Sequence, residues 1–206
     1  MVRYGAAYAG AVLLPLAEQL LLHLPLPADR RGVAPFGDDG GALIEAAKRT
    51  STVVLMPDVA DGAVLVALCT AGDDERAWLR LEASSDAGQR VAAVVWDAAA
   101  PPLHERALQA ALGAAHVNSL SLQRFRSDLR ARIARGWRAT AMHDVARFDG
   151  VTQCWNALLE HRAELADQLV AKCEAAAQRA LAAALEPATQ PDGTLRIPIN
   201  AVLLER

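Results

Sequence analysis

Three short apolar runs restrict the folds open to this chain of 206 residues. They are residues 52–56 (TVVLM), 63–69 (AVLVALC) and 90–96 (RVAAVVW). Their length and their content of valine, leucine and alanine are typical of buried strands. A helical pattern at residues 42–49 precedes the first run, and another at residues 73–83 separates the second from the third. Strands that alternate with helices predict a mainly parallel sheet with helices on both faces.

The N-terminal part, residues 6–24, repeats leucine at helical spacing, at Leu13, Leu16, Leu20 and Leu24. This spacing predicts an amphipathic helix that can lie on a sheet, and the prolines at positions 25 and 27 end it. Its most apolar stretch, residues 9–22, is interrupted by Pro15, Glu18 and Gln19. We therefore expect this stretch to be too short and too interrupted to cross a membrane.

The remaining elements follow from the same rules. Residues 33–36 predict a short strand that Pro35 weakens, and Gly88 ends the helix that precedes the third apolar run. Ser121 is a suitable N-cap and Gly136 a suitable C-cap for a helix over residues 121–135. The other expected elements are a helix at 103–115, a strand at 137–148, a long helical stretch at 151–185 broken near His161, a turn at 191–193 and a final strand at 195–204.

A glycine-rich turn, residues 37–41 (GDDGG), lies between the strand at 33–36 and the helix at 42–49. A strand, a glycine turn and a helix N-terminus together can hold the polar part of a nucleotide-like ligand through backbone N–H groups. The same residues also suit a solvated turn that caps the next helix, and the sequence favours that simpler interpretation. Asp58 and Asp61 are open to both interpretations, as ligand contacts or as ordinary turn residues.

The order of these elements resembles that of class I S-adenosylmethionine-dependent methyltransferases of the small-molecule type. The resemblance covers nearly the whole chain as a collinear series, although no single motif is strong. Gly37 and Gly41 match the outer glycines of the family's cofactor loop, and residues 57–61 (PDVAD) resemble the segment whose acid contacts adenine, which places Asp58 there. The family implies a three-layer αβα sandwich: a reduced Rossmann-like fold with a mainly parallel sheet and an antiparallel C-terminal strand.

The departures from the family fall on the cofactor site. Pro35 stands where the family has the strand-end acid, and Asp39 replaces the middle glycine of the loop. Glycine suits that position because the backbone must approach the ligand closely. An aspartate brings a side chain and a negative charge next to the cofactor carboxylate, at a cost on the order of 1–4 kcal/mol.

Between the helix at 42–49 and the Asp58 turn, only one strand fits, where the family has two strands and a helix. If residues 52–56 are the third strand, the second strand with its ribose-binding acid is absent. If they are the second strand, Pro57 stands at the acid position and the adenine-contacting segment is missing. The likeness of residues 58–61 to the adenine segment favours the first alignment, and both remove half of the nucleoside clamp.

The histidines, cysteines, tryptophans and arginines of the sequence are expected to have mainly structural roles. The histidines are scattered without paired spacing, so surface or satisfied histidines are expected, with His116 as the one candidate near the pocket mouth. Cys69, Cys154 and Cys173 have no CxxC spacing, which argues against disulfides and zinc and favours a reducing cytoplasm. Trp96, Trp137 and Trp155 are expected in the core. Five arginines form a solvated face, or a surface for an acidic partner, on one helix: Arg124, Arg126, Arg130, Arg132 and Arg135.

Taken together, the sequence predicts one domain, residues 1–206. It has an N-terminal helical segment at 1–30, a degenerate cofactor half at 31–100 and a C-terminal half at 101–206. The favoured function is a cytoplasmic pseudoenzyme: a methyltransferase-like partner or binding subunit with a vestigial site at Gly37, Asp39, Gly41 and Asp58. No catalytic residue, cofactor or metal is assigned, and we expect a homodimer or a heteromer with a related methyltransferase. The alternative is an active methyltransferase that binds S-adenosylmethionine and a small organic acceptor. A net charge of −3 argues against nucleic acid.

Overall fold

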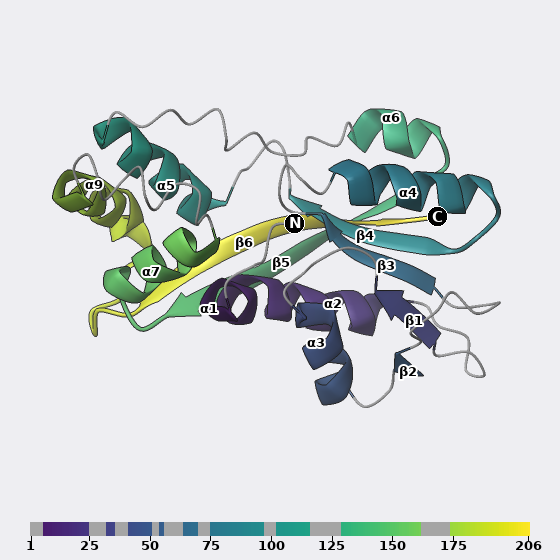
Figure 1. The fold of residues 1–206 in the computed structure, drawn as a ribbon, viewed down its shortest axis with the longest axis horizontal. Helices are drawn as coiled ribbons and strands as arrows, with labels where there is room; N and C mark the ends of the chain where they lie inside the picture. Colours follow the sequence, from purple (N-terminus) through teal and green to yellow (C-terminus); the bar gives the residue numbers. More distant parts are fainter. Residues whose placement is uncertain are drawn as a thin grey trace.

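The structure, a computed structural model, describes residues 6–24, 32–35, 41–50, 54–55, 64–69, 75–96, 102–115, 129–161 and 174–206. Six strands within these ranges form one sheet in the order β2-β1-β3-β4-β6-β5 (Figure 1). The first four strands are parallel, and β6 runs antiparallel to both β4 and β5. The strands are β1 Gly32–Pro35, β2 Val54–Leu55, β3 Val64–Cys69, β4 Val91–Trp96, β5 Arg138–Phe148 and β6 Leu195–Glu205. The predicted mainly parallel sheet with an antiparallel C-terminal strand is confirmed.

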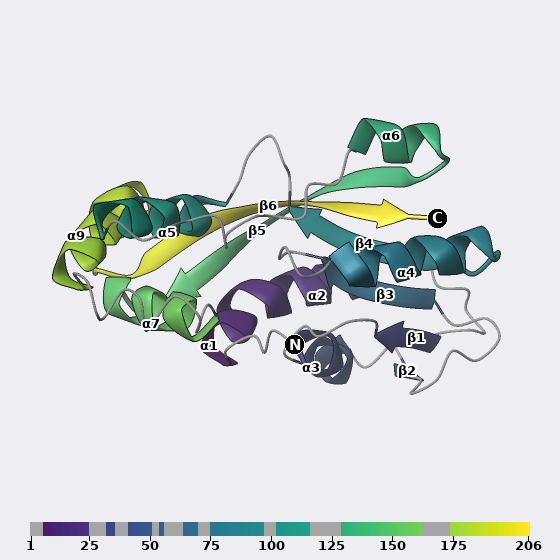
Figure 2. The same cartoon turned by 45° about the horizontal axis from the view of Figure 1, so that its top comes forward.

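The helices form layers on both faces of this sheet (Figures 1 and 2). In β3, Val64, Val66 and Leu68 join the larger core with α2 and α3, whereas Leu65 and Ala67 join the smaller core under α4. This alternation is the period of two that buries both faces of a strand. The described helices are α1 Ala6–Tyr8, η1 Ala9–Leu13, α2 Leu14–His23, α3 Ala42–Thr50, α4 Glu75–Asp86, α5 Leu103–Ala114, α6 Leu129–Ala134, α7 Val151–His161, α9 Glu174–Leu185 and η4 Glu186–Ala188.

The N-terminal helix is continuous but contains a π-helical turn, η1, immediately before α2. Pro15 explains this irregularity, because proline has no N–H to donate and its ring crowds the preceding turn. The Leu14 N–H accordingly reaches back to the carbonyl of Ala9. The predicted leucine stripe is confirmed: Leu13, Leu16 and Leu20 are fully buried and Leu24 is 7% exposed.

The expectation that this helix is too short for a membrane span needs correction. Helical backbone continues over Ala6–His23, which reaches the length and apolar content of a helix that could cross a membrane. Half of that stretch is buried inside the protein, where α2 packs on α3 and β5. A core helix passes the same test, so the helix's role in the core accounts for its composition.

The antiparallel pair β5 and β6 contains the longest strands of the sheet, and the helices α7 and α9 lie between them in the chain (Figure 1). Val91 and Arg206 exchange both backbone hydrogen bonds, at 2.8 and 3.0 Å. Because N–H and C=O groups alternate sides along a strand, even-numbered β6 residues therefore face β4 and odd-numbered ones face β5. Pro198 is even-numbered and lies beyond the last pair with β4, Trp96↔Ala201. Its missing N–H therefore costs the sheet no hydrogen bond.

The predicted helix ends are confirmed where the structure describes them. Gly88 and Gly136 adopt left-handed backbone conformations, with φ of 87° and 90°, after α4 and α6. Such a conformation ends a helix, and glycine adopts it without a Cβ clash. α7 is described as far as His161, and the residues after it, where the sequence predicted a break, lie outside the described ranges. Ser121, the predicted N-cap, lies outside the described residues.

Leucines of α2 provide a test of this packing. We expect Leu16→Ala to lower the free energy of unfolding by about 2–5 kcal/mol, because Leu16 is fully buried. Leu22 is 70% exposed on the same helix, so Leu22→Ala is the matched control, with a change within about 0.5 kcal/mol. Urea denaturation followed by circular dichroism measures both. Equal losses in the two variants would contradict this packing.

Candidate functional site

The direction of the helical connections defines where a ligand would bind on such a sheet. The β1–α3–β2 unit places its helix on the larger core, and the β3–α4–β4 unit places its helix on the smaller core. β1 and β3 are neighbours, so the connections from these two strands leave in opposite directions. In open α/β sheets, ligands bind outside the carboxyl ends of the strands at such a switch point.

The structure places part of the predicted cofactor loop at this edge. β1 ends on Pro35, so the residue that replaces the family's acid does lie at the strand end. Gly41 has a φ of 80° directly before α3, and its carbonyl accepts a 2.9 Å hydrogen bond from the Glu45 N–H. Gly37, Asp39 and Asp58 lie outside the described residues, as do Asp38, Gly40 and Asp61. Of the four predicted site residues, only Gly41 is therefore placed.

A buried aromatic cluster closes the carboxyl end of β4. The Tyr8 hydroxyl lies 3.2 Å from His104 Nε2, and the His104 ring stands edge-on to Trp96 with centroids 5.9 Å apart. All three side chains are buried, with exposures of 1%, 0% and 5% for Tyr8, His104 and Trp96. The helix N-terminus that follows β4 is thus packed against the N-terminal helix.

This cluster bears on several expectations. His104 is a buried, hydrogen-bonded histidine, one of the two structural roles expected of the histidines, whereas His116 lies outside the described residues. Trp96, Trp137 and Trp155 are buried as predicted. Tyr8 was not predicted as part of this cluster, because on a regular α-helix it lies about 140° around from Leu13, off the apolar side. The π-helical turn at Ala9–Leu13 changes that spacing.

The strand pairing places the one strand described between α3 and β3. Leu55 of β2 and Val64 of β3 both lie level with Val33 of β1, on opposite sides of it. The end of β2 is therefore about 10 Å, two strand spacings, from the start of β3. A helical crossover, which takes about a dozen residues, is not required for that step.

β2 lies directly beside β1, the place of the second strand in the doubly wound order 3-2-1-4-5-6. This pairing favours the alignment in which residues 52–56 are the second strand, rather than the preferred alignment with the third. In that alignment Pro57 follows at the acid position, and the strand beyond β2 is the one not seen among the described residues.

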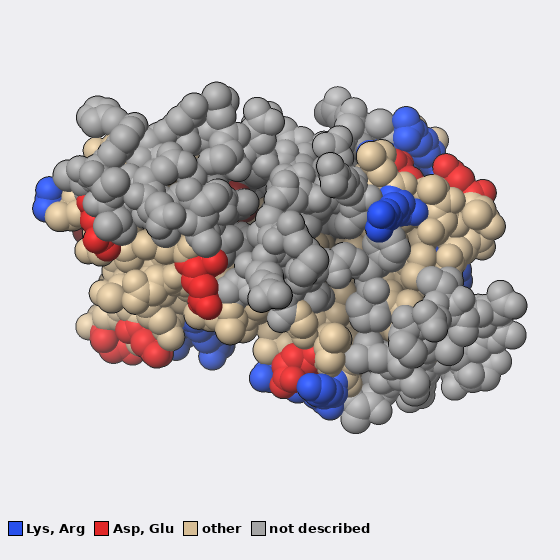
Figure 3. Space-filling model, in the orientation of Figure 1, with Lys and Arg blue, Asp and Glu red and all other residues tan. Residues whose placement is uncertain are grey.

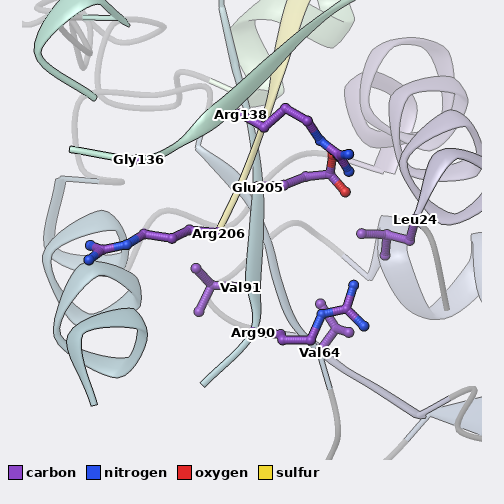
Figure 4. A pocket seen from close by; sticks show the side chains of 8 residues that line it. All are labelled: Leu24, Val64, Arg90, Val91, Gly136, Arg138, Glu205 and Arg206. Atoms are coloured by element: carbon purple, nitrogen blue, oxygen red, sulfur yellow. The ribbon is translucent and has the colours of Figure 1, made fainter. Parts of the chain in front are cut away.

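A surface pocket of about 310 Å³ lies at the opposite edge of the sheet, at the amino ends of β3 and β4. It is lined by Leu24, Val64, Arg90, Val91, Gly136, Arg138, Glu205 and Arg206. Two of its arginines are already paired, Arg138 with Glu205 and Arg206 with Asp86, both at 2.7 Å. Figure 4 shows Arg138 turned toward Glu205 and Arg206 turned away from both. This pocket is therefore separate from the switch-point edge.

The predicted solvated arginine face is wrong for Arg132, which points inward. Its guanidinium lies 4.7 Å from the Trp78 ring centroid and pairs with Glu82. Trp78 in turn packs on Trp137 with centroids 5.0 Å apart. Burial, and secondarily the charge of Arg135, lowers the pKa of Arg132. Arg132 thus anchors α6 to α4, while the side chains of Arg124, Arg126 and Arg130 lie outside the described residues.

Charges on the described surface are mixed in sign. On α3, Glu45 pairs with Lys48 at 3.5 Å and with Arg49 at 3.3 Å, and Arg49 also lies 3.5 Å from Glu18. Figure 3 shows these acidic and basic side chains together over α3, and both signs again near α4 and α6. On the described part of this face, no large basic area is formed.

Cys154 is the cysteine whose side chain the structure describes, and it is unsuited to nucleophilic chemistry. It is fully buried on α7 and forms no disulfide, and burial raises its pKa to about 12. The side chain of Cys69 and all of Cys173 lie outside the described residues. No group of three or more histidine, cysteine, aspartate or glutamate side chains in the described ranges is arranged to hold a metal ion.

Comparisons with known proteins give two weak structural likenesses. No protein-family model matches the sequence, and no curated protein matches it. A solved structure from Bacillus halodurans, described as a candidate methyltransferase, aligns with 92% of this chain and 96% of its own at 12% identity and a TM-score of 0.40. A candidate type II methyltransferase from Anaeromyxobacter dehalogenans aligns with 100% and 97% at 14% identity and a TM-score of 0.37. Because both likenesses are weak, the fold class rests on the strand order and pairing above.

The contact between Arg132 and Glu82 generates a stability prediction. Their side chains are only 15% and 16% exposed, so Glu82→Ala leaves a buried guanidinium without its carboxylate. We expect a loss of about 1–3 kcal/mol in the free energy of unfolding. Asp86→Ala is the control on the same helix, since Asp86 is 67% exposed and such pairs contribute at most about 1 kcal/mol. Chemical denaturation of both variants tests this, and a loss in Asp86→Ala as large as in Glu82→Ala would contradict it.

The raised pKa of Cys154 predicts slow alkylation. At pH 8 a thiol with a pKa of about 12 carries about a thousandfold less thiolate than an ordinary one. Iodoacetamide labelling, with peptide mapping by mass spectrometry, should therefore leave Cys154 unmodified in the native protein and modify it after denaturation. Rapid native labelling at Cys154 would show that the residue is accessible and ionised.

Proposed function

We propose that this chain is a methyltransferase-like protein with an eroded S-adenosylmethionine site. It acts as a non-catalytic partner or binding subunit of an enzyme in small-molecule biosynthesis. The coarse part of this proposal, a doubly wound α/β sheet with an antiparallel C-terminal strand, is the observed fold. The loss of cofactor binding and the partner role go further and are tested below.

The observation that carries the proposal is the shortened end of the sheet. β2 has two residues, pairs only with β1, and forms the sheet edge among the described strands. In the doubly wound arrangement a third strand and its helix lie beyond this point. The family resemblance places the ribose and adenine contacts in these two units. A chain that carries only the one unit seen among the described residues would lack half of the surface that holds the nucleoside.

Two further features of the switch-point edge support the loss. β1 ends on Pro35, which has neither a carboxylate nor an N–H to offer a ligand. At the end of β4, Tyr8, Trp96 and His104 pack against one another and are buried. Because these side chains already contact one another, the protein itself occupies the space at the end of β4.

One observation favours the alternative, an active methyltransferase with a rearranged loop. Gly41 retains a left-handed conformation, φ 80°, at the entry to α3. A glycine turn at that place lets the backbone approach a ligand closely. In such an enzyme, catalysis would depend mainly on positioning the cofactor and acceptor. The two functions differ in whether the cofactor binds.

Calorimetric titration with S-adenosylmethionine separates them. We expect no saturable binding at micromolar protein concentration, because the proposed site lacks half of the nucleoside clamp and the family alignment puts the charge of Asp39 at the loop position next to the cofactor carboxylate. Asp39→Gly is the comparison variant: a gain of roughly tenfold or more in affinity corresponds to the removal of at least about 1.4 kcal/mol of repulsion. Micromolar binding by the unaltered protein would refute the eroded site and favour the active enzyme.

The proposal also includes a cellular location and a partner. A reducing cytoplasm remains the proposed location, since Cys154 is a free thiol in the described structure. The proposed partner is a second copy of the chain or a related methyltransferase.

A further inference from the structure

The outer edge of β5 is a candidate interaction surface, because β5 is the last of the described strands of the sheet. Odd-numbered β6 residues face β5, as shown by the bonds between Val91 and Arg206. Each odd-numbered β6 residue pairs with an even-numbered β5 residue, for example Leu203 with Thr140. The N–H and C=O groups of odd-numbered β5 residues therefore point away from the sheet. These groups belong to Ala139, Ala141, His143, Val145 and Arg147.

Part of this edge is closed by side chains. Gln19 of α2 donates from Nε2 to the His143 carbonyl at 2.8 Å and to Asp144 Oδ2 at 2.9 Å. Asp144 Oδ1 accepts a 2.7 Å hydrogen bond from the Val145 N–H. These contacts independently confirm that His143 and Val145 face outward. They also cover this part of the edge, which protects it from pairing with another strand.

The first part of β5 has no such protection among the described contacts. Arg138, Ala139, Thr140 and Ala141 are all exposed, so neither face of the strand is covered there. The paired residues of β6 are buried, with Leu203 1% and Leu204 0% exposed. The exposed stretch begins earlier, on α6, with Ile133 at 54%. Figure 2 shows this stretch of β5 running from α6 along β6 at the outside of the molecule.

We propose that residues 138–142 form a homodimer interface, in which β5 of one chain pairs antiparallel with β5 of a second copy about a two-fold axis at Thr140. In this register Ala139 faces Ala141 of the partner subunit as a hydrogen-bonded pair. By symmetry, Ala141 faces Ala139 of the partner subunit in the same way. The two-fold axis makes the same short segment serve both chains, as an isologous interface requires. Strand addition of this kind binds through main-chain hydrogen bonds.

The side chains in this register are self-complementary. Thr140 lies opposite its own copy at a non-hydrogen-bonded position, where side chains are closest and threonine pairs hydrogen-bond. Arg138 lies diagonally across from Asp144 of the other chain, on the same face of the strand, within reach of a long side chain. Arg138 is itself 66% exposed and held at 2.7 Å by Glu205. Opposite charges therefore meet twice, and no like charges are directly opposed.

The guarded residues set the limits of the interface. Gln19 covers the edge at His143, so a longer register that uses His143 would have to displace its hydrogen bonds to β5. The register centred on Thr140 forms its main-chain hydrogen bonds within the uncovered segment only, through Ala139 and Ala141. This inference specifies the partner role proposed above, but it is independent of cofactor binding, because β5 and β1 lie in opposite halves of the sheet.

Sedimentation analysis over a wide range of protein concentrations tests the proposal. We expect the unaltered protein to show a reversible monomer–dimer equilibrium and Ala141→Pro to remain monomeric. Proline at position 141 removes an outward N–H and leaves the ladder to β6 intact. Arg147→Pro is the control, since Arg147 also turns its N–H outward on the same edge but lies outside the proposed segment, and it should dimerise like the unaltered protein. Circular dichroism confirms that each variant is folded.

Oxidative cross-linking gives a second measurement that does not depend on a proline variant folding. Opposed residues at a non-hydrogen-bonded position lie about 4.5 Å apart at Cα, which suits a disulfide. Thr140→Cys should therefore form a covalent dimer much faster than Val145→Cys, whose copies lie far apart in this register. Three outcomes would overturn the proposal: a monomer at every concentration, a dimer that survives Ala141→Pro, or equal cross-linking at both positions. The sedimentation analysis tests the dimer and the calorimetric titration tests cofactor binding, so either proposal can fail without the other.

Discussion

The insertion of β6 between β4 and β5 is the contact on which the rest of this fold depends. β4 and β5 come from different parts of the chain, and each pairs with β6 rather than with the other. The central β6 residues are buried from Ala201 to Leu204. β6 is antiparallel to both neighbours, and its pairing with each of them links the parallel strands to β5 within one sheet. The end of the chain therefore completes the sheet that its first half begins.

The two ends of this sheet have different properties. At one end β2 is only two residues long, and the step to β3 is short because Leu55 and Val64 lie level with Val33. At the other end β5 is long, and its edge is covered at His143 and Val145 by Gln19 and Asp144. The candidate ligand site lies toward the first end and the proposed strand pairing lies at the second, so changes at one need not disturb the other.

Much of the fold could be predicted from the sequence, because each buried strand is a short apolar run and each helix has a regular spacing of apolar residues. Gly88 and Gly136 were predictable helix ends, since their left-handed conformation favours glycine. The inward turn of Arg132 was not predictable, because a charged residue on a helix is usually solvated and only the positions of Trp78 and Glu82 reverse that preference. The apolar length of Ala6–His23 was underestimated, because Pro15 is accommodated by a π-helical turn rather than ending the helix.

The sequence by itself determined the strand–helix alternation, the amphipathic N-terminal helix and the substitution of proline and aspartate at the expected cofactor loop. These are local features, set by the spacing of apolar residues and by the backbone limits of glycine and proline. The tertiary structure alone decided which strands are neighbours. It placed β2 beside β1 and packed Tyr8 on His104, 96 positions further along the chain. It also directed the backbone N–H and C=O groups of the odd-numbered β5 residues away from the sheet. Those relations depend on pairing between distant segments, and no local pattern records them.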